Sequence, residues 1–289
     1  SDESRPILPI FTEVGLCAVI NPYVGIYYTP DYFNNSKSYE RKFQPILYNM
    51  TKETSMSIRV TKNIMGEYNL YVHSPNDVVN YESKNTTCYF AKATTVKVNT
   101  INVHTTEDVR KLSIGQRYCK LNSETQGLVH SPVYSYSMCR TDCRIQICHS
   151  HCDCTPYYYR RTNEPICNLQ GMLCIAKLDV MLKTLRDPLT NKTMCNCMQD
   201  CDSSLIIIDL VQSKAWFQDT LLTVQIDTLT QPRYVRKLLF SKMDIVVQQG
   251  GIFGLCLGCS ILSIIEIVYF TTLRFFWGAI KKMSIKTSL

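Results

Sequence analysis

Residues Gln249 to Phe270 read QGGIFGLCLGCSILSIIEIVYF and are almost entirely apolar. From Gly250 to Leu273 the only charged residue is Glu266. A helix rises about 1.5 Å per residue, so about 20 apolar residues are enough to cross a bilayer. The stretch therefore predicts a membrane-spanning helix near the end of the chain.

Three features of this stretch point beyond a simple anchor. Gly250, Gly254 and Gly258 recur every four residues and form a small-residue stripe, along which helices can approach closely. Ser260 adds a polar atom at membrane depth. Glu266 is ionisable, which is costly in a bilayer unless the side chain faces water or a partner. These three features are expected both in a pore-lining helix and in a membrane anchor that dimerises.

Composition excludes several classes of function. The chain has 289 residues, 45% hydrophobic and 19% charged, which suits one or two folded domains and a single span. The net charge is +7, but the basic residues are scattered, so we expect no nucleic-acid binding. No hydrolase motif or glycine-rich phosphate loop occurs, so we expect no enzyme. His73, His104 and His130 are isolated in the sequence, which favours satisfied strand or surface histidines over catalysts.

Cysteines and glycosylation sequons indicate the compartment. Thirteen of the 15 cysteines lie between Cys17 and Cys201, which is typical of a disulfide framework outside the cytosol. Four sequons share this part of the chain, at Asn34, Asn49, Asn85 and Asn191. The short tail after the span is basic, which suits the cytoplasmic side. Because the chain begins at Ser1 without an export signal, we expect it to be a fragment of a longer protein.

Hydrophobic alternation predicts a mostly β ectodomain. Alternating, β-branched segments at residues 55–60, 68–73, 94–104, 203–211 and 221–229 predict strands. Residues 1–16 are proline-rich and are expected to be extended. Residues 119–201 carry most of the cysteines and are called the cysteine module below.

Spacing within the cysteine module suggests a helix facing a strand. Cys139 and Cys143 are four residues apart and share a helix face, whereas Cys195 and Cys197 are two apart and share a strand face. Such a pair of elements can carry two stacked disulfides, although spacing alone leaves the connectivity open.

Two other uses of the cysteines, metal binding and thiol exchange, suit the sequence less well. The run from Cys148 to Cys154 resembles a set of zinc ligands, but its spacings are tight and an oxidising compartment favours disulfides, so we expect no metal. Thiol–disulfide exchange would need a Cys-x-x-Cys after a strand, and that spacing occurs only within the apolar span, at Cys256 and Cys259.

The final stretch resembles the second transmembrane segment of the degenerin, epithelial sodium channel and acid-sensing channel family, and is most similar to the insect pickpocket branch. Further matching motifs cover essentially the whole chain: Glu13-x-Gly15-Leu16-Cys17, Tyr71-Val72-His73-Ser74-Pro75, Arg117-Tyr118-Cys119, Cys139-Arg140-x-Asp142-Cys143, Cys152-Asp153-Cys154-x-Pro156 and Cys195-x-Cys197-x-x-x-Cys201. The residues after Cys17 depart from the family pattern. The family's first membrane helix and His-Gly motif are absent from this sequence.

The resemblance implies an α+β fold. It consists of a disulfide-rich β palm ectodomain over residues 1–244, with a helical thumb at 119–201. One transmembrane α-helix at 245–275 and a short cytoplasmic tail at 276–289 follow. The chain is then a subunit of a homo- or hetero-trimer in the plasma membrane, with the ectodomain outside. Three second helices line an amiloride-sensitive, sodium-selective pore, Na⁺ being the permeant ion and no cofactor being required.

The resemblance also implies individual roles. It places the selectivity filter on Gly258, Cys259 and Ser260, and the pore-lining and blocker region on Gly250, Gly251, Gly254 and Glu266. It implies five disulfides: Cys119–Cys201, Cys139–Cys197, Cys143–Cys195, Cys152–Cys174 and Cys154–Cys167. Cys17, Cys88 and Cys148 stay unassigned, with Cys17 free to pair with Cys88 or with sequence upstream.

An alternative function is a non-conducting accessory subunit, or a disulfide-rich receptor or adhesion ectodomain on a membrane anchor. The sequence leaves the gating stimulus and any extracellular ligand open. No rich acidic cluster surrounds Asp77 that would suggest proton sensing.

Overall fold

The computed structural model describes residues 7–20, 22–34, 54–60, 66–160, 164–216, 219–226, 233–258, 260–274 and 276–277. Strands and helices are mixed, which agrees with the predicted α+β class. The chain divides into two compact units, Ser1–Arg236 and Lys237–Leu289, and each is considered by itself. The predicted boundaries of the ectodomain, span and tail stay predictions.

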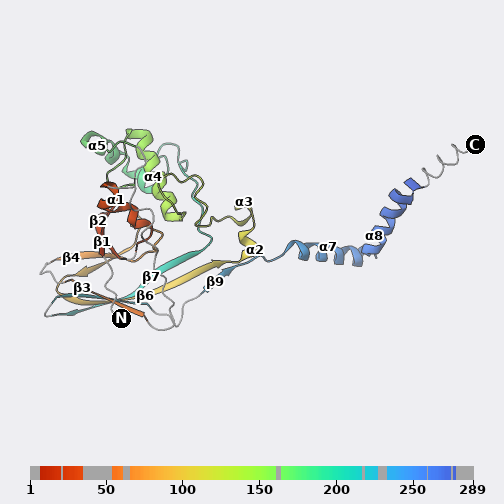
Figure 1. Cartoon of the computed structure of the whole chain (residues 1–289), viewed down its shortest axis with the longest axis horizontal. Helices are drawn as coiled ribbons and strands as arrows, with labels where there is room; N and C mark the ends of the chain where they lie inside the picture. Colours follow the sequence, from red (N-terminus) through yellow and green to blue (C-terminus); the bar gives the residue numbers. More distant parts are fainter. Residues whose placement is uncertain are drawn as a thin grey trace, which may run out of the picture. The chain divides into compact units, whose positions relative to one another are not determined.

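A five-stranded sheet forms the base of the larger unit (Figure 1). Its order is β3 (Thr54–Val60), β8 (Thr220–Ile226), β6 (Lys92–Thr105) and β7 (Ser203–Ala215). β9 (Arg233–Arg236) pairs with β6 beyond the end of β8. The β3–β8 and β6–β7 pairs are antiparallel, whereas β8 and β9 run parallel to β6. The predicted strands at 55–60, 94–104 and 203–211 are confirmed, and the one predicted at 221–229 is confirmed over residues 221–226, its last three residues lying outside the described ranges.

β6 is the central strand because it pairs with three others. Threonine, valine and isoleucine dominate its sequence, and such β-branched residues favour a pleated surface. Val96 and Val98 lie on one face and are buried against Leu222 of β8. The alternation seen in the sequence therefore marks the true core face of this strand.

Two hairpins complete the β structure. β4 (Glu67–Tyr71) pairs with β5 (Asn85–Tyr89), which confirms the strand predicted near residue 68 and adds a partner that was not predicted. β1 (Ile7–Thr12) pairs with β2 (Gly15–Ile20), so the proline-rich start is a hairpin and not merely an extended segment. Gly15 turns this hairpin at φ +119, a conformation that glycine adopts without steric cost.

The helix α4 (Tyr136–Cys152) is the longest element of the cysteine module. The Ser135 hydroxyl caps its start by accepting from the Met138 amide, and Asp153 ends it in a left-handed conformation. The short helices α2 (Glu107–Arg110) and α3 (Ile114–Arg117) precede it, and α5 (Leu169–Lys177) and α6 (Asp179–Thr184) follow.

α4 is buried on more than one face because two cores meet on it. Met138 packs with Ile10, Val19 and other residues of the β1–β2 hairpin and of η1 (Val24–Tyr28). Further along the helix, Ile147 packs towards α5 and α6. Figure 1 shows α1 (Pro30–Asn34), the β1–β2 hairpin and α4 gathered on one side of the main sheet.

Five disulfides fasten the cysteine module: Cys119–Cys201, Cys139–Cys197, Cys143–Cys195, Cys152–Cys174 and Cys154–Cys167. These are the pairs that the family resemblance implied. α4 thus carries two stacked disulfides, although the segment holding Cys195 and Cys197 belongs to no sheet among the described residues. Cys17, Cys88 and Cys148 are free thiols, so Cys17 and Cys88 are not joined.

Candidate functional site

The apolar end of the chain forms two helices instead of the single predicted one. α7 (Lys242–Leu257) and α8 (Ile261–Val268) run in different directions in Figure 1, and the π-helical turn η3 (Tyr269–Leu273) follows α8. Within the described ranges, no helix combines the length and the apolar character needed to cross a membrane. The prediction of one continuous helix over 245–275 is therefore not confirmed.

The interruption has a local cause in the sequence. Gly258 adopts φ +63, the left-handed conformation with which glycine ends many helices. Ser260 then begins α8 as its N-cap, because the Ser260 hydroxyl accepts a hydrogen bond from the Ser263 amide at 3.2 Å. Cys259 lies outside the described residues. The tripeptide expected to form the filter therefore coincides with the break between the two helices.

Such a break gathers polar atoms in an apolar segment. The last carbonyls of α7 lack intrahelical partners, and the carboxyl end of a helix carries the negative end of its dipole. The Ser260 and Ser263 hydroxyls lie 3.3 Å apart beside it. An arrangement of this kind offers oxygen atoms that can contact a cation.

The residues expected to line the pore are accessible in a single chain. A Cβ atom added at Gly250 or Gly251 would meet nothing within 4 Å. Gly254 is half-buried and Glu266 is exposed on α8. Leu255 is 90% exposed. This apolar surface is available for lipid or for another chain to cover.

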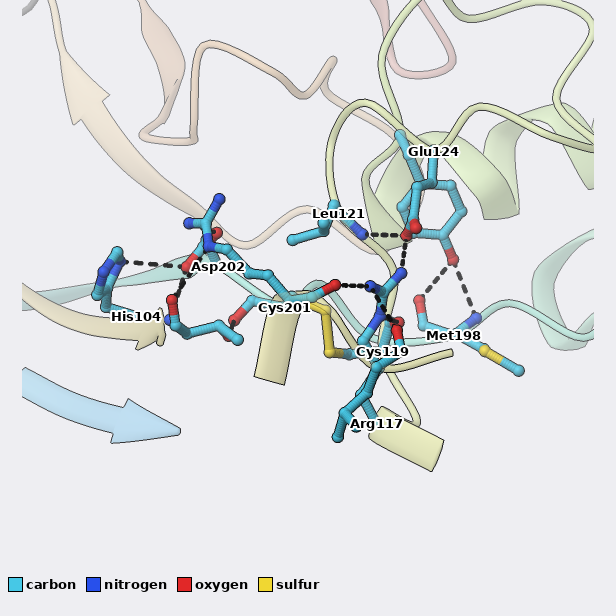
Figure 2. Close-up of a disulfide and its surroundings, with 12 residues drawn as sticks. His104, Arg117, Cys119, Leu121, Glu124, Met198, Cys201 and Asp202 are labelled. Carbon is cyan, nitrogen blue, oxygen red and sulfur yellow. Dashed lines mark hydrogen bonds and ion pairs between the residues drawn. A yellow bond between two sulfur atoms is a disulfide. The ribbon is translucent and has the colours of Figure 1, made fainter. Parts of the chain in front are cut away.

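In the larger unit, a disulfide joins the two ends of the cysteine module to each other, just before β7 of the main sheet begins. Figure 2 shows Cys119 and Cys201 bonded where the module begins and ends. Lys120 donates its amide to the Gln199 carbonyl at 3.0 Å, and Cys201 donates to the Lys120 carbonyl at 2.9 Å. The two crossing segments are therefore held together by backbone hydrogen bonds as well as by the disulfide.

Arg117 fixes the entry of the module. This guanidinium is almost fully buried, donates to the Cys119 carbonyl at 2.9 Å and pairs with Glu124. Glu124 also accepts from the Leu121 amide at 2.8 Å. Burial opposes ionisation of Glu124, but the bonds from Leu121 and Arg117 outweigh it and lower the pKa of the carboxyl. The ion pair between Arg117 and Glu124 therefore holds the loop after Cys119 in place (Figure 2).

Asp202 plays the matching role at the exit of the module. Its carboxylate accepts from the Thr105 amide at 2.8 Å and from Arg110 at 2.6 Å, and it lies 3.3 Å from the ring of His104. The Thr105 hydroxyl donates to the Cys201 carbonyl at 2.5 Å. The end of β6, the start of β7 and α2 consequently meet at one carboxylate (Figure 2).

A cavity of about 510 Å³ opens beside this junction. Three carboxylates face it, from Asp77, Asp200 and Asp202. Asp77 accepts from the Ser135 hydroxyl at 2.5 Å, and Asp200 accepts from the Tyr136 amide at 3.0 Å. Two acidic groups from distant segments therefore hold the amino end of α4.

Burial shifts the pKa of both of these acids upward. It raises the pKa of Asp200 to about 6; the Tyr136 amide opposes the shift and the charge of Asp77 adds to it. Burial likewise raises the pKa of Asp77, against the bond from Ser135. The expectation of no acidic cluster around Asp77 was therefore wrong, because it considered only neighbours along the chain and Asp200 arrives from the far end of the module.

A second charged network anchors α4 to the β1–β2 hairpin. The guanidinium of Arg144 is fully buried, lies 3.3 Å from Glu13 and also pairs with Glu82. Glu13 accepts in addition from the Tyr159 hydroxyl at 2.6 Å and from the Tyr81 amide at 2.8 Å. Glu13 belongs to the early motif that carried the family resemblance, and here it joins the hairpin turn to the cysteine module.

Two of the three histidines treated as isolated have charged partners. The ring of His130 is buried between Asp142 and Glu164, and that of His104 faces Asp202. His73 contacts the Ser74 carbonyl at 2.8 Å. The zinc interpretation of residues 148–154 loses two ligands, because Cys152 and Cys154 are committed to disulfides.

The four expected glycosylation sites differ in where they lie in the structure. Asn85 and Asn191 are exposed, the first at the start of β5 and the second in a turn. Asn34 ends α1, and Asn49 lies outside the described residues. Glycosylation stays a prediction at all four.

Comparisons with known proteins agree on one family. A family model described as "Amiloride-sensitive sodium channel" matches residues 3–270. Sodium channel protein Nach of Drosophila virilis is 25% identical over 211 residues, which cover 66% of this chain and 54% of that protein. Nach of Drosophila melanogaster is 26% identical over 178 residues, covering 56% of this chain and 32% of that protein. Pickpocket protein 11 of Drosophila melanogaster is 24% identical over 194 residues, covering 58% and 35%. The matched part thus spans between about a third and about half the length of these relatives.

Proposed function

Because this chain belongs to the amiloride-sensitive sodium channel family, we propose that it is a subunit of a sodium-selective channel whose pore passes along Gly250 to Glu266. Members of this family are plasma-membrane ion channels rather than enzymes, and they need no cofactor. The family assignment bears out the resemblance to the insect pickpocket branch, since relatives of that name match the chain.

The observation that carries the proposal is the helix break at Gly258 and Ser260. Carbonyls at the carboxyl end of α7 and the Ser260 hydroxyl supply oxygen atoms at the level expected for the filter, and such oxygens replace part of the hydration shell of a cation. Cys259, between them, is small enough for a narrow constriction. In this arrangement Glu266 supplies negative potential on the inner side of the filter.

The surfaces that a single chain leaves uncovered support the proposal that the subunits assemble, and we place three copies around the pore. Around the pore segment, close approach of three copies needs small side chains, which Gly250, Gly251 and Gly254 provide. In the larger unit, β7 is an edge strand of the described sheet and exposes Leu205 (58%) and Ile207 (41%). Exposed apolar edge strands are normally covered by a partner. Homo- and hetero-trimers with related subunits both satisfy this requirement.

The proposed topology places the larger unit outside the cell and the basic tail inside. The five disulfides need an oxidising compartment. Amiloride would then reach the outer pore near Gly250, Gly251 and Gly254. The opening stimulus is an extracellular ligand or another signal received by this unit.

Whole-cell current tests the proposal. Cells expressing the full-length subunit that contains this chain, alone and with a pickpocket-type subunit, should carry an amiloride-blocked Na⁺ current. Gly258→Ala and Ser260→Ala should each lower the ratio of Na⁺ to K⁺ permeability. Gly115→Ala, at an ectodomain glycine where an added Cβ meets nothing, is the matched control.

Surface labelling must accompany the current measurement. Normal surface density without current in either combination would support the accessory or receptor alternative. A Na⁺ current whose selectivity is unchanged by both substitutions would show that the filter lies elsewhere.

A further inference from the structure

The cavity beside the Cys119–Cys201 junction is built from segments that lie far apart in the sequence. Its walls are the loop after β4, the segment before α4, the end of the cysteine module, and parts of β6, β7 and β9, all within the larger unit. Its volume of about 510 Å³ is within the range of cavities that bind small molecules. Val103 is the single apolar residue among those that line it, so a polar molecule suits this cavity.

Two carboxylates face the cavity without a cation. Asp77 accepts from the Ser135 hydroxyl at 2.5 Å and Asp200 accepts from the Tyr136 amide at 3.0 Å, each through one of its two oxygens. Within the described ranges neither acid forms an ion pair, and burial raises the pKa of both. A cation beside them would offset the burial of their charges and their mutual repulsion.

Arg233 of β9 brings a positive charge to the same cavity. Its guanidinium forms no ion pair with any carboxylate in the part of the chain that the structure describes. The third acid of the cavity, Asp202, is already paired with Arg110 at 2.6 Å. The cavity therefore contains charges of both signs that are not paired with one another.

We propose that this cavity binds a small zwitterion, a molecule that carries both an ammonium and a carboxylate, such as an amino acid or a short peptide with free ends. The ammonium donates to the uncommitted oxygens of Asp77 and Asp200, and the carboxylate accepts from the Arg233 guanidinium. A simple anion would be repelled by the two acids, and a simple cation would leave Arg233 unpaired. The inference concerns the larger unit alone and stands whether or not the chain conducts.

Glycine and glycylglycine are suitable probes, because both carry the two charges but hold them at different separations. Isothermal titration calorimetry at pH 7.4, on the full-length subunit that contains this chain in detergent, should give a Kd below about 10 mM for at least one of them. The tighter probe indicates whether an amino acid or a peptide fits the cavity. Its N-acetylated form lacks the ammonium and its amide lacks the carboxylate, and each should bind at least about fivefold more weakly.

Two substitutions show which residue recognises which end of the probe. Arg233→Gln should bind the tighter probe and its amide about equally, because the partner of the carboxylate is gone. Asp200→Asn keeps an acceptor for the Tyr136 amide but should lose much of the preference for the free ammonium over the N-acetylated form. Arg59→Gln, at an exposed arginine of β3 outside the cavity, is the matched control and should bind as the native chain does.

Three results would overturn the zwitterion site. The first is that neither probe binds the native protein at concentrations up to about 10 mM. The second is that the native protein binds the tighter probe and its two capped forms equally. The third is that Arg233→Gln and Asp200→Asn discriminate among the three forms as Arg59→Gln does.

Discussion

The carboxylate of Asp200 accepts a hydrogen bond from the Tyr136 backbone amide at 3.0 Å, in the first turn of α4. Asp200 directly precedes Cys201, where the cysteine module returns to the sheet. Beside it, Asp77 binds the capping hydroxyl of Ser135. The amino end of α4 is thus held by two acids, one of which lies where the module returns to the sheet.

Asp200→Asn should stabilise the larger unit at neutral pH. The pKa of Asp200, about 6, lies above that of an unfolded aspartate, so the native group favours folding at low pH and loses this contribution as the pH rises through about 6. Asparagine keeps an acceptor for Tyr136 without the buried charge. We expect a gain of about 1 kcal/mol at pH 7.4, a value reduced for partial exposure, and none at pH 4. Thermal unfolding at both pH values measures it.

The exposed Asp209 of β7 provides the control for that experiment. Asp209→Asn should leave the unfolding midpoint unchanged at both pH values. Equal midpoints for Asp200→Asn and the native chain at pH 7.4 would contradict the assigned shift.

Arg144→Met should be among the most damaging substitutions in the larger unit. It leaves Glu13, whose side chain is 2% exposed, as a buried charge without its cation, at a cost of about 3–5 kcal/mol. Adding Glu13→Gln should recover much of the loss, because Glu82 is 39% exposed and still pairs with Arg140. Denaturant unfolding compares the single and double variants.

Lys183→Gln serves as the reference for Arg144→Met. It breaks an exposed pair with Asp179 and should cost less than about 1 kcal/mol. If Arg144→Met costs no more than Lys183→Gln, the buried network does not stabilise the fold as argued.

The disulfides should differ in their contribution according to loop length. Cys139 and Cys197 are 58 residues apart and Cys154 and Cys167 are 13 apart. In the chain-entropy model these loops correspond to about 4 and about 3 kcal/mol. Paired alanine substitutions, followed by unfolding without reductant, should therefore lower the midpoint more for the longer loop. A larger loss of midpoint for the Cys154–Cys167 variant would show that local packing, and not loop length, sets the contribution of each disulfide.

Ser260 should matter to helix structure as well as to permeation. Ser260→Ala removes the acceptor for the Ser263 amide and should destabilise the first turn of α8 by about 1 kcal/mol. Ser260→Asn keeps an N-cap acceptor and should restore protection of the Ser263 amide in hydrogen exchange. Equal protection of the Ser263 amide in Ser260→Ala and Ser260→Asn would show that the side chain at position 260 does not cap α8.

Asn85 and Asn191 should carry glycans if the larger unit is extracellular, since both are exposed. Asn85→Gln and Asn191→Gln should each increase gel mobility by one step, and enzymatic deglycosylation should abolish the difference. Asn99→Gln, at an asparagine outside any sequon, should have no effect. Unchanged mobility of both test variants would contradict the proposed topology.

The pattern of neighbouring residues predicted those strands and helices that depend on short-range periodicity. Alternation located β6, because a strand buried on one face repeats every two residues. It did not reveal the β1–β2 hairpin, since Pro6 and Pro9 suggested an unpaired segment and Pro9 is accommodated in a two-stranded ribbon. The sequence did not predict the helix break, because a glycine at position 258 suits close approach of helices as well as the left-handed backbone that ends α7.

The sequence by itself determined the family, the mixed α and β elements and the apolar end of the chain, because these depend on composition, short-range periodicity and motifs read along the chain. Only the tertiary structure decided which distant polar groups meet. Asp77 with Asp200, Arg144 with Glu13, and His130 with Glu164 are brought together by packing around α4. Burial then raises the pKa of Asp77, Asp200 and Glu13, because a carboxylate takes its pKa from its neighbours in space and not from those along the chain.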